Sequence, residues 1–300
     1  MGFLYLLISK LSAIGKMIAM KNCGKLASGA KNSLKINLIR SLGCVAVSLV
    51  MCIFAGFSEM SGAGIGISVL SGISNAALLF LWVLCAERCS LCSVEIFCMI
   101  GGVALPLLVT PLLFGGETIF LSQWLGALLL FPAAYCFSLK SKSESSKLSP
   151  VSILFLLGAC LSNAGCVISQ KLFTHYNSGS AADFNMLTFI FCSATLGIAL
   201  LLFSLKKSAD KPDARLDLSH RKHIIVYIII AIVMLYLAQY FSTLSSGELP
   251  SAYFFPLSYA IGMPLTLLTD VIVFKEKIKI SSIIGILSVI GAVILISLKF

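Results

Sequence analysis

Charged residues are scarce in this sequence, since Asp, Glu, Lys and Arg together make up only 11% of its 300 residues. Soluble domains are usually about 25% charged, because they need a polar surface. Here 59% of the residues are hydrophobic and the mean hydropathy is +1.03, so the chain cannot cover itself with such a surface. These proportions exclude a water-soluble fold and predict a protein embedded in a lipid bilayer.

The sequence also lacks the motifs of enzymes and ATP-driven pumps. It contains no H-E-x-x-H, no G-x-S-x-G and no glycine-rich phosphate loop, and its three histidines, His175, His220 and His223, fall at loops or at segment ends. The eleven cysteines lie mostly in apolar segments, and the pair Cys89 and Cys92 has no histidine nearby. We therefore predict no enzymatic activity, no metal site and no cofactor.

Long, continuous apolar runs are abundant. A helix needs about 20 mostly apolar residues to cross a bilayer, and the runs lack the alternation of a barrel strand. The sequence predicts an all-α polytopic membrane protein with ten transmembrane helices, near 3–21, 35–57, 64–86, 92–114, 118–139, 150–174, 183–205, 223–245, 250–274 and 279–298.

The two halves of the chain resemble each other. A shift of 150 residues aligns Ser12, Gly15 and Lys21 with Ser162, Gly165 and Lys171, and a shift of 159 aligns Glu117, Ser122 and Gly126 with Glu276, Ser281 and Gly285. We predict two repeats of five helices, over residues 1–145 and 146–300. Because five is odd, the second repeat must enter the membrane from the opposite side, so the repeats are expected to be inverted, as in many transporters.

With this duplication, the sequence resembles the ten-helix, EamA-type members of the drug/metabolite transporter superfamily. The resemblance also rests on Phe-Lys-Glu-Lys-Ile at 274–278 followed by Gly285 and Gly291, on a Gly-Glu-Thr-Ile echo before Gly126, and on Arg40 at the start of the second segment. It implies a solute carrier or exporter that works by alternating access, with a central cavity lined by helices 1, 3, 4, 6, 8 and 9. Substrates of the superfamily range from amino acids and amphipathic cations to nucleotide sugars and lipid-linked sugars.

Polar residues inside the predicted spans mark a candidate binding site, because they are costly in a bilayer and usually face the bundle interior. Those at helical spacing predict a substrate-binding site made of Ser9, Ser12, Lys16, Ser71, Asn75, Trp82, Ser162, Asn163, Gln170, Tyr236, Gln239, Tyr240 and Tyr259. Lys10 points away from the face of Ser9, Ser12 and Lys16, and it is included because a lysine near the middle of a segment is harder to explain by snorkelling. The alternative for the small residues is interhelical packing, and for Lys16 it is snorkelling to the helix end. A buried lysine that faces a cavity would favour a carboxylate or a phosphate.

Two acids, Glu95 and Asp270, lie near the ends of predicted spans. They are candidates for proton coupling, and pairing with a lysine or solvation at the helix end are the alternatives. Most of the 22 basic residues fall in the connections after odd-numbered segments, which predicts that these face the cytoplasm and that both termini lie outside. The resemblance implies the opposite, because typical ten-helix relatives keep both termini inside.

The combined prediction is a secondary transporter of small organic solutes, such as metabolites, amino acids or drug-like compounds, in the plasma membrane. Its expected partners are the solute and the lipid bilayer. No nucleic-acid partner is expected, because basic loops that face anionic lipid account for the net charge of +10. A homodimer is left open, as are a lipid-linked-sugar flippase of the same fold and a non-transporting scaffold or receptor.

Overall fold

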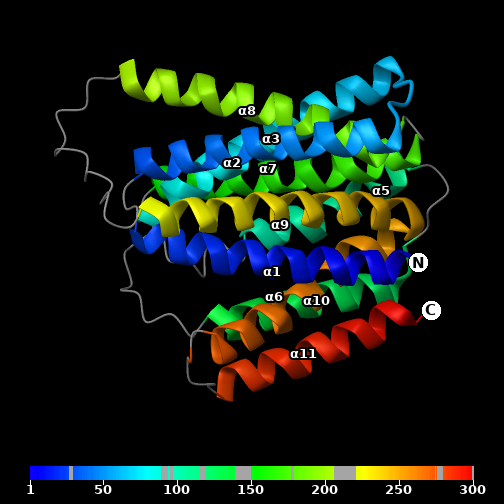
Figure 1. The fold of residues 1–300 in the computed structure, drawn as a ribbon. Helices are drawn as coiled ribbons and strands as arrows, with labels where there is room; N and C mark the ends of the chain where they lie inside the picture. The colour runs from blue at the N-terminus through cyan, green and yellow to red at the C-terminus, as the bar shows by residue number, and fades with distance from the viewer. Residues whose placement is uncertain are drawn as a thin grey trace.

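The computed structural model describes residues 1–26, 30–88, 94, 97–114, 119–138, 150–176, 179–205, 221–273, 275 and 280–298. Within these ranges the secondary structure is helical, with no β-strand (Figure 1). The elements are α1 (Gly2–Leu26), α2 (Ala30–Ala55), α3 (Gly62–Arg88), the π-helix η1 (Ile100–Ala104), α5 (Leu105–Leu113), α6 (Leu121–Ser138), α7 (Pro150–His175), α8 (Ala181–Leu205), α9 (Arg221–Glu248), α10 (Ser251–Ile272) and α11 (Ile280–Ser297).

Seven of these helices contain a stretch long and apolar enough to cross a membrane. The stretches are Gly2–Met20, Asn32–Ala55, Gly62–Trp82, Pro150–His175, Ala181–Leu202, His223–Glu248 and Ser251–Thr269. Three shorter apolar helices, Phe97–Leu113, Leu121–Ala133 and Ile283–Ile296, fall within the predicted fourth, fifth and tenth segments. The prediction of a helical, multi-pass membrane protein is therefore confirmed.

Proline and serine mark several helix starts. α7 begins at Pro150, and α10 begins directly after Pro250, where the missing proline N–H costs no intrahelical bond. α8 follows Ser180, whose hydroxyl accepts a hydrogen bond from the Asp183 N–H at 3.1 Å. The Asp183 carboxylate accepts a hydrogen bond from the Ser180 hydroxyl in turn, at 2.6 Å, while the Ser180 N–H donates to the Ser58 hydroxyl at 2.9 Å.

The distribution of side chains fits a bilayer. Large apolar side chains such as Ile53, Leu112 and Leu154 are exposed on the outside of the bundle. Serines are buried inside it, where Ser193 donates to the Ser41 hydroxyl at 2.9 Å and joins α8 to α2. Apolar surface that faces lipid costs nothing, whereas polar groups there would lose their hydrogen bonds, so this arrangement is the stable one in a membrane.

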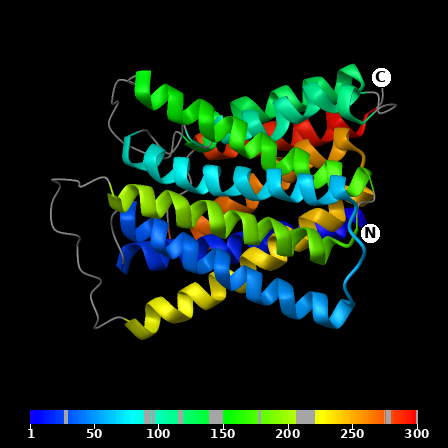
Figure 2. The same ribbon diagram turned by 90° about the horizontal axis from the view of Figure 1, so that it is seen from above.

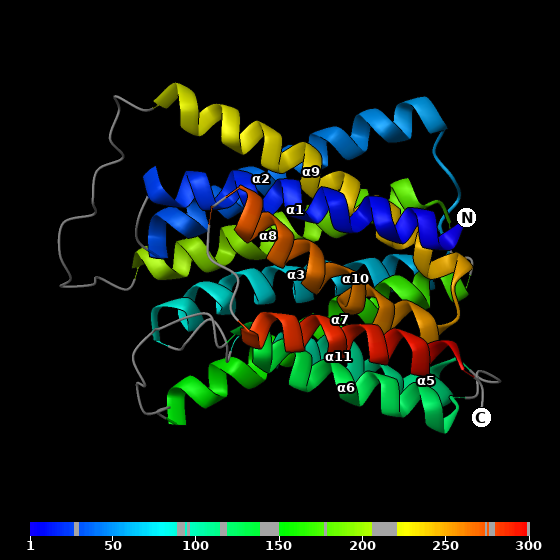
Figure 3. The same cartoon turned by 90° about the horizontal axis from the view of Figure 1, so that it is seen from below.

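The helices lie side by side, and both chain termini lie at the same end of the bundle (Figures 1, 2 and 3). Three contacts join distant segments at that end. The Met1 ammonium pairs with Glu248 at 3.2 Å, Ser58 donates to Asp183 at 2.5 Å, and Ser122 donates to the Leu298 carbonyl at 2.7 Å.

Close helix packing depends on glycine. α1 packs on α9, α3 on α7, α2 on α8 and α6 on α11. A Cβ atom at Gly126 of α6 would lie 2.8 Å from the Ala292 carbonyl of α11, and a Cβ at Gly15 of α1 would lie 2.9 Å from the Met234 sulfur of α9. Small residues thus let these backbones approach each other, as is usual in membranes.

Candidate solute-binding site

Three predicted site residues from three different helices converge in the bundle. The Asn163 side-chain amide of α7 donates to the Tyr259 hydroxyl of α10 and to the Cys98 carbonyl, both at 2.6 Å. The Tyr259 hydroxyl lies 3.4 Å from the same carbonyl. The Lys10 ammonium of α1 lies 5.9 Å from the centroid of the Tyr259 ring, within the range of a cation–π contact.

The π-helix η1 makes room for this group. Within it the Leu105 N–H donates to the Ile100 carbonyl, five residues back, and such a bulge often occurs at functional sites. A Cβ atom at Gly102 would overlap the Tyr259 hydroxyl, and one at Gly101 would overlap the Cys160 carbonyl of α7. Both glycines are therefore required for the close approach of η1 to α7 and α10. The sequence did not predict a π-helix here.

The polar face of α1 contains two buried serines and one partly accessible lysine. Ser9 is buried and donates to the Ala238 carbonyl of α9 at 2.7 Å, so it joins two helices, as the packing alternative proposed. Ser12 is buried on the same face. Lys16, also on this face, stays partly accessible.

The polar residues of α3 lie along one side of that helix. Ser71 is buried, and its hydroxyl has no hydrogen-bond partner among the described residues. Asn75 donates to the Ser71 carbonyl of its own helix at 3.2 Å. Trp82 follows Ser71 by eleven residues, or about three turns, and so shares its face, yet it is 43% exposed. On this face of α3, the side chain of Ser71 is therefore buried and that of Trp82 is exposed.

At the other end of the bundle, α7 and α9 are joined by a polar seam, which consists of Gln170 and Thr174 on α7 and Ser242 and Ser246 on α9. Ser242 donates to the Gln170 side-chain carbonyl at 3.0 Å, and the Thr174 and Ser246 hydroxyls lie 3.2 Å apart. Ser162, earlier on α7, is partly buried. Gln170, predicted as a substrate-binding residue, is buried here in a contact between two helices.

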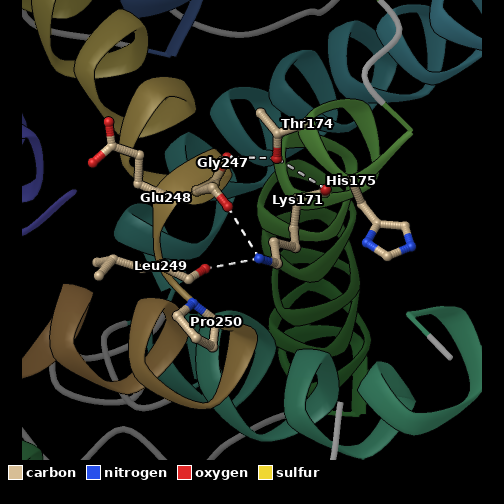
Figure 4. Close-up of a pocket in the computed structure, with 8 residues that line it drawn as sticks. Lys171, Thr174, His175, Gly247, Glu248, Leu249 and Pro250 are labelled. Atoms are coloured by element: carbon tan, nitrogen blue, oxygen red, sulfur yellow. Dashed lines mark hydrogen bonds between the residues drawn. The ribbon is translucent and has the colours of Figure 1, made fainter. Parts of the chain in front are cut away.

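Lys171 holds the C-terminal end of α9, as Figure 4 shows. Its buried ammonium donates to the Ser246 carbonyl at 3.1 Å and to the Leu249 carbonyl at 2.7 Å, where a cation also suits the helix dipole. The pocket around it has a volume of about 350 Å³ and includes His175, Glu248 and Pro250. This pocket lies where α9 ends and α10 begins. From the sequence alone, Lys171 stands out only as the repeat mate of Lys21.

The residues of α9 face different neighbours. Tyr236 is buried against Cys44 and Phe189 of α2 and α8, and its hydroxyl has no hydrogen-bond partner among the described residues. It stacks on Tyr240, with ring centroids 5.8 Å apart. Gln239 and Tyr240 are partly accessible. Tyr236 therefore packs in a different cluster from Tyr259, and the structure does not bring the two together.

The structure does not describe the side chains of the two predicted acids, and it reveals a third acid that was not predicted. Glu95 lies outside the described residues, as does the side chain of Asp270, whose backbone belongs to α10. Asp183, which sequence reasoning missed, is buried near the start of α8 and accepts hydrogen bonds from the Ser58 N–H and hydroxyl and from the Ser180 hydroxyl. The pattern Ser180-x-x-Asp183 was the signal that could have identified it. Within the described part of the chain, no cluster of three or more His, Cys, Asp or Glu residues could hold a metal ion.

Comparisons with known proteins agree with this architecture. Residues 150–298 match the EamA-like transporter family. A solved crystal structure aligns with 99% of this chain and 94% of its own, with a TM-score of 0.72 and 15% sequence identity, which shows a shared fold. A search of curated proteins finds no match.

The family match confirms two predictions, the resemblance and the absence of enzymatic activity, because the EamA-like family is a family of transporters. A transporter of this kind takes a small solute and is surrounded by membrane lipid. The protein is thus a multi-pass integral membrane transporter that belongs to the drug/metabolite transporter superfamily.

Proposed function

We propose that this protein is a secondary transporter that moves small organic solutes across the membrane by alternating access. Metabolites, amino acids and drug-like compounds are the candidate cargoes. In this proposal the chain crosses the membrane ten times, as two inverted five-helix halves, 1–145 and 146–300, that rock about a site between them. The plasma membrane as location and a homodimer as assembly remain predictions from the sequence.

The observation that carries this proposal is the pairing of the helices. If the halves are repeats, α1 corresponds to α7, α2 to α8, α3 to α9 and α6 to α11. If each helix is replaced by its repeat mate, the α1–α9 contact becomes an α7–α3 contact, and the α2–α9 contact becomes an α8–α3 contact. All four of these contacts occur. Single residues follow the same rule, because Gly15 packs against Met234 and its repeat mate Gly165 packs against Ser74.

The positions of the connections support an even number of crossings. Met1 and Glu248, Ser58 and Asp183, and Ser122 and Leu298 all meet at the end of the bundle where both termini lie. In a chain of ten crossings these positions are the termini and the connections after segments 2, 4, 6 and 8, which must all face the same side. The contacts therefore fit ten crossings, including the three helices shorter than about 20 residues.

One contact that is made in one half and not in the other supports alternating access. α7 packs on α9 through the polar seam, whereas their mates α1 and α3 make no extended contact among the described residues. Trp82, near the end of α3, is correspondingly exposed. A transporter caught with one end closed and the other accessible would differ between its halves in this way.

Solute flux into proteoliposomes tests the proposal. Purified protein would be reconstituted and assayed with amino acids, organic cations, organic anions, nucleosides and nucleotide sugars, with and without a pH gradient. We expect saturable uptake of one class, and its dependence on the gradient would show whether protons are coupled. If folded, monodisperse protein moves none of these classes, the proposal is wrong and a scaffold or a lipid-linked-sugar flippase takes its place.

A further inference from the structure

The junction between α9 and α10 leaves two backbone carbonyls without their usual partners. In a continuous helix the Ser246 carbonyl would accept from the N–H of residue 250, but that residue is Pro250, which has none. The Tyr253 N–H, which a continuous helix would offer to the Leu249 carbonyl, donates instead to the Pro250 carbonyl at 3.0 Å. Ser246 and Leu249 are buried, so their carbonyls need other donors.

Lys171 of α7 supplies both donors. Its ammonium donates to the Ser246 carbonyl at 3.1 Å and to the Leu249 carbonyl at 2.7 Å (Figure 4). Lys171 is only 6% exposed, so these bonds are shielded from water. A hydrogen bond from a charged donor is roughly twice as strong as one between neutral groups. Lys171 and these two carbonyls are called the closing contact below.

The closing contact belongs to the polar seam that joins α7 to α9. Gln170 accepts from the Ser242 hydroxyl at 3.0 Å. The Thr174 and Ser246 hydroxyls lie 3.2 Å apart. In the first half, the mates α1 and α3 make no extended contact among the described residues. If the two halves exchange their arrangements during transport, α7 must move away from α9, and the closing contact must break.

A polar pocket lies beside the closing contact. It has a volume of about 350 Å³, and Lys171, Ser246 and Leu249 belong to its lining together with Thr174 and Glu248. Water that enters this pocket can solvate the ammonium and the carbonyls once they separate. The closing contact can therefore open without leaving a bare charge in the membrane, which would be costly.

From this geometry we infer that Lys171 determines how readily this end of the transporter opens. Its ammonium binds two carbonyls that the helix junction leaves without a backbone donor, and so stabilises the arrangement that is closed here and accessible near Trp82 of α3. The inference rests on the proposed alternating access and names the residue that sets the balance between its two arrangements. Lys171 acts as a positioning residue, and the role requires no contact with the solute.

Labelling of purified protein with a water-soluble maleimide tests the inference. One reporter is Ser246→Cys at the seam, where the serine is fully buried and where the substitution keeps the backbone carbonyl. The other is Trp82→Cys at the opposite end, where the tryptophan is 43% exposed. We expect Lys171→Met to speed labelling of Ser246→Cys about tenfold or more and to slow labelling of Trp82→Cys about threefold or more, because opening one end closes the other.

Three further proteins serve as controls. Lys171→Arg keeps the charge and several N–H donors, so both labelling rates should stay within about threefold of those without it. Lys35→Met removes an exposed positive charge from α2 and should change neither rate. Ser48→Cys replaces a fully buried serine that donates to the Cys44 carbonyl of its own helix at 2.7 Å, so it reports general unfolding and should stay unlabelled in every variant. The protein without a reporter gives the background of the native cysteines.

Pro250→Ala tests the physical cause. It restores an N–H that can donate to the Ser246 carbonyl, so the effect of Lys171→Met on Ser246→Cys should fall to less than about threefold in this background. An undiminished effect would overturn the role assigned to the missing proline N–H. If Lys171→Met does not fold, Lys171→Gln, which keeps a donor of shorter reach, takes its place with the same expected directions.

Faster labelling of Ser246→Cys without slower labelling of Trp82→Cys would mean that Lys171 only holds the helix junction, and would overturn the inference. Unchanged rates at both reporters, or a Trp82→Cys that does not react even with Lys171 present, would overturn it as well. Flux into proteoliposomes separates these failures from failure of the proposed function. Flux without the expected shifts leaves transport and rejects the role of Lys171. The reciprocal shift without any flux supports that role and overturns solute transport.

Discussion

At the scale of single residues, Asn163 makes the contacts that connect three elements of the candidate site. Its amide holds both the Tyr259 hydroxyl and the Cys98 carbonyl at 2.6 Å. Asn163→Ala removes both hydrogen bonds, and hydrogen bonds between membrane helices contribute about 0.6 kcal/mol on average and about 1.7 kcal/mol at most. We expect a modest loss of stability together with a loss of about tenfold in transport efficiency, which corresponds to ~1.4 kcal/mol.

Ser204→Ala provides the matched control for this variant. Ser204 also lies on a helix and donates a hydrogen bond, but to the Leu200 carbonyl of its own helix at 2.8 Å, on an exposed surface. Thermal unfolding and flux would be measured on both variants. Wild-type flux in Asn163→Ala would show that the group formed by Asn163, Tyr259 and Lys10 does not take part in transport.

Single residues also show where prediction from the sequence stopped. Position inside a predicted span identified Lys10, Asn163 and Tyr259, because polar groups there are rare. Position could not show that Ser9 bonds to the Ala238 carbonyl, or that Tyr236 packs toward α2 and α8, because both depend on which helices are neighbours. Pairing between segments far apart in the chain leaves no local signal.

At the scale of elements, the π-helix η1 packs closely against both α7 and α10, through Gly101 and Gly102. Gly102→Ala would place a methyl group against the Tyr259 hydroxyl, so Tyr259 or the backbone must move. Overpacking of this kind costs about 1–3 kcal/mol. We expect a lower Tm and reduced flux.

Gly197→Ala in α8 is the matched control for this change. A Cβ atom there would meet no atom within 4 Å, and alanine is favoured over glycine in a helix by about 1 kcal/mol. This control should therefore be neutral or more stable, with unchanged flux. Equal effects of the two substitutions would mean that helix propensity, and not the contact with Tyr259, determines the result.

The polar seam between α7 and α9 is a second element whose role is testable. Because the Thr174 and Ser246 hydroxyl oxygens are 3.2 Å apart and each is bonded to its Cβ atom, as a cysteine sulfur would be, cysteines at both positions should form a disulfide under mild oxidation. If alternating access opens this end, the Thr174→Cys, Ser246→Cys double variant should lose flux on oxidation and regain it on reduction. A cross-linked protein with full flux would show that the seam never opens.

The chain has eleven native cysteines, so this experiment needs its own controls. The single variants Thr174→Cys and Ser246→Cys carry the same native thiols but cannot form the new bond. Both should keep their flux under oxidation. A loss in either single variant would assign the effect to a native cysteine.

At the scale of the whole molecule, composition and run length were sufficient to predict a helical membrane protein. Seven of the predicted segments coincide with helices that are long and apolar enough to cross a membrane, because about 20 apolar residues in a row leave a chain few other structures in a bilayer. The fourth segment was predicted as one span, and the π-helix within it has no distinct sequence signal beyond Gly101 and Gly102. The sequence therefore predicts the elements better than their local distortions.

Orientation is the property of the whole molecule on which the charge pattern and the family resemblance disagree. Most basic residues follow the odd-numbered predicted segments in the sequence, and connections rich in basic residues usually stay in the cytoplasm. We follow the charge and expect the termini outside. Glu59, exposed in the connection between α2 and α3, lies at the same end as the termini.

A cysteine in each of two connections, one after an even-numbered and one after an odd-numbered predicted segment, tests this orientation in intact cells. Glu59→Cys should react with a membrane-impermeant maleimide in intact cells. Ser208→Cys, in the hydrophilic stretch between the seventh and eighth predicted segments, should react only after permeabilisation. The wild type, with its native cysteines, gives the background. The reverse labelling pattern would place both termini inside, and the basic connections would then face outward for a reason other than membrane insertion.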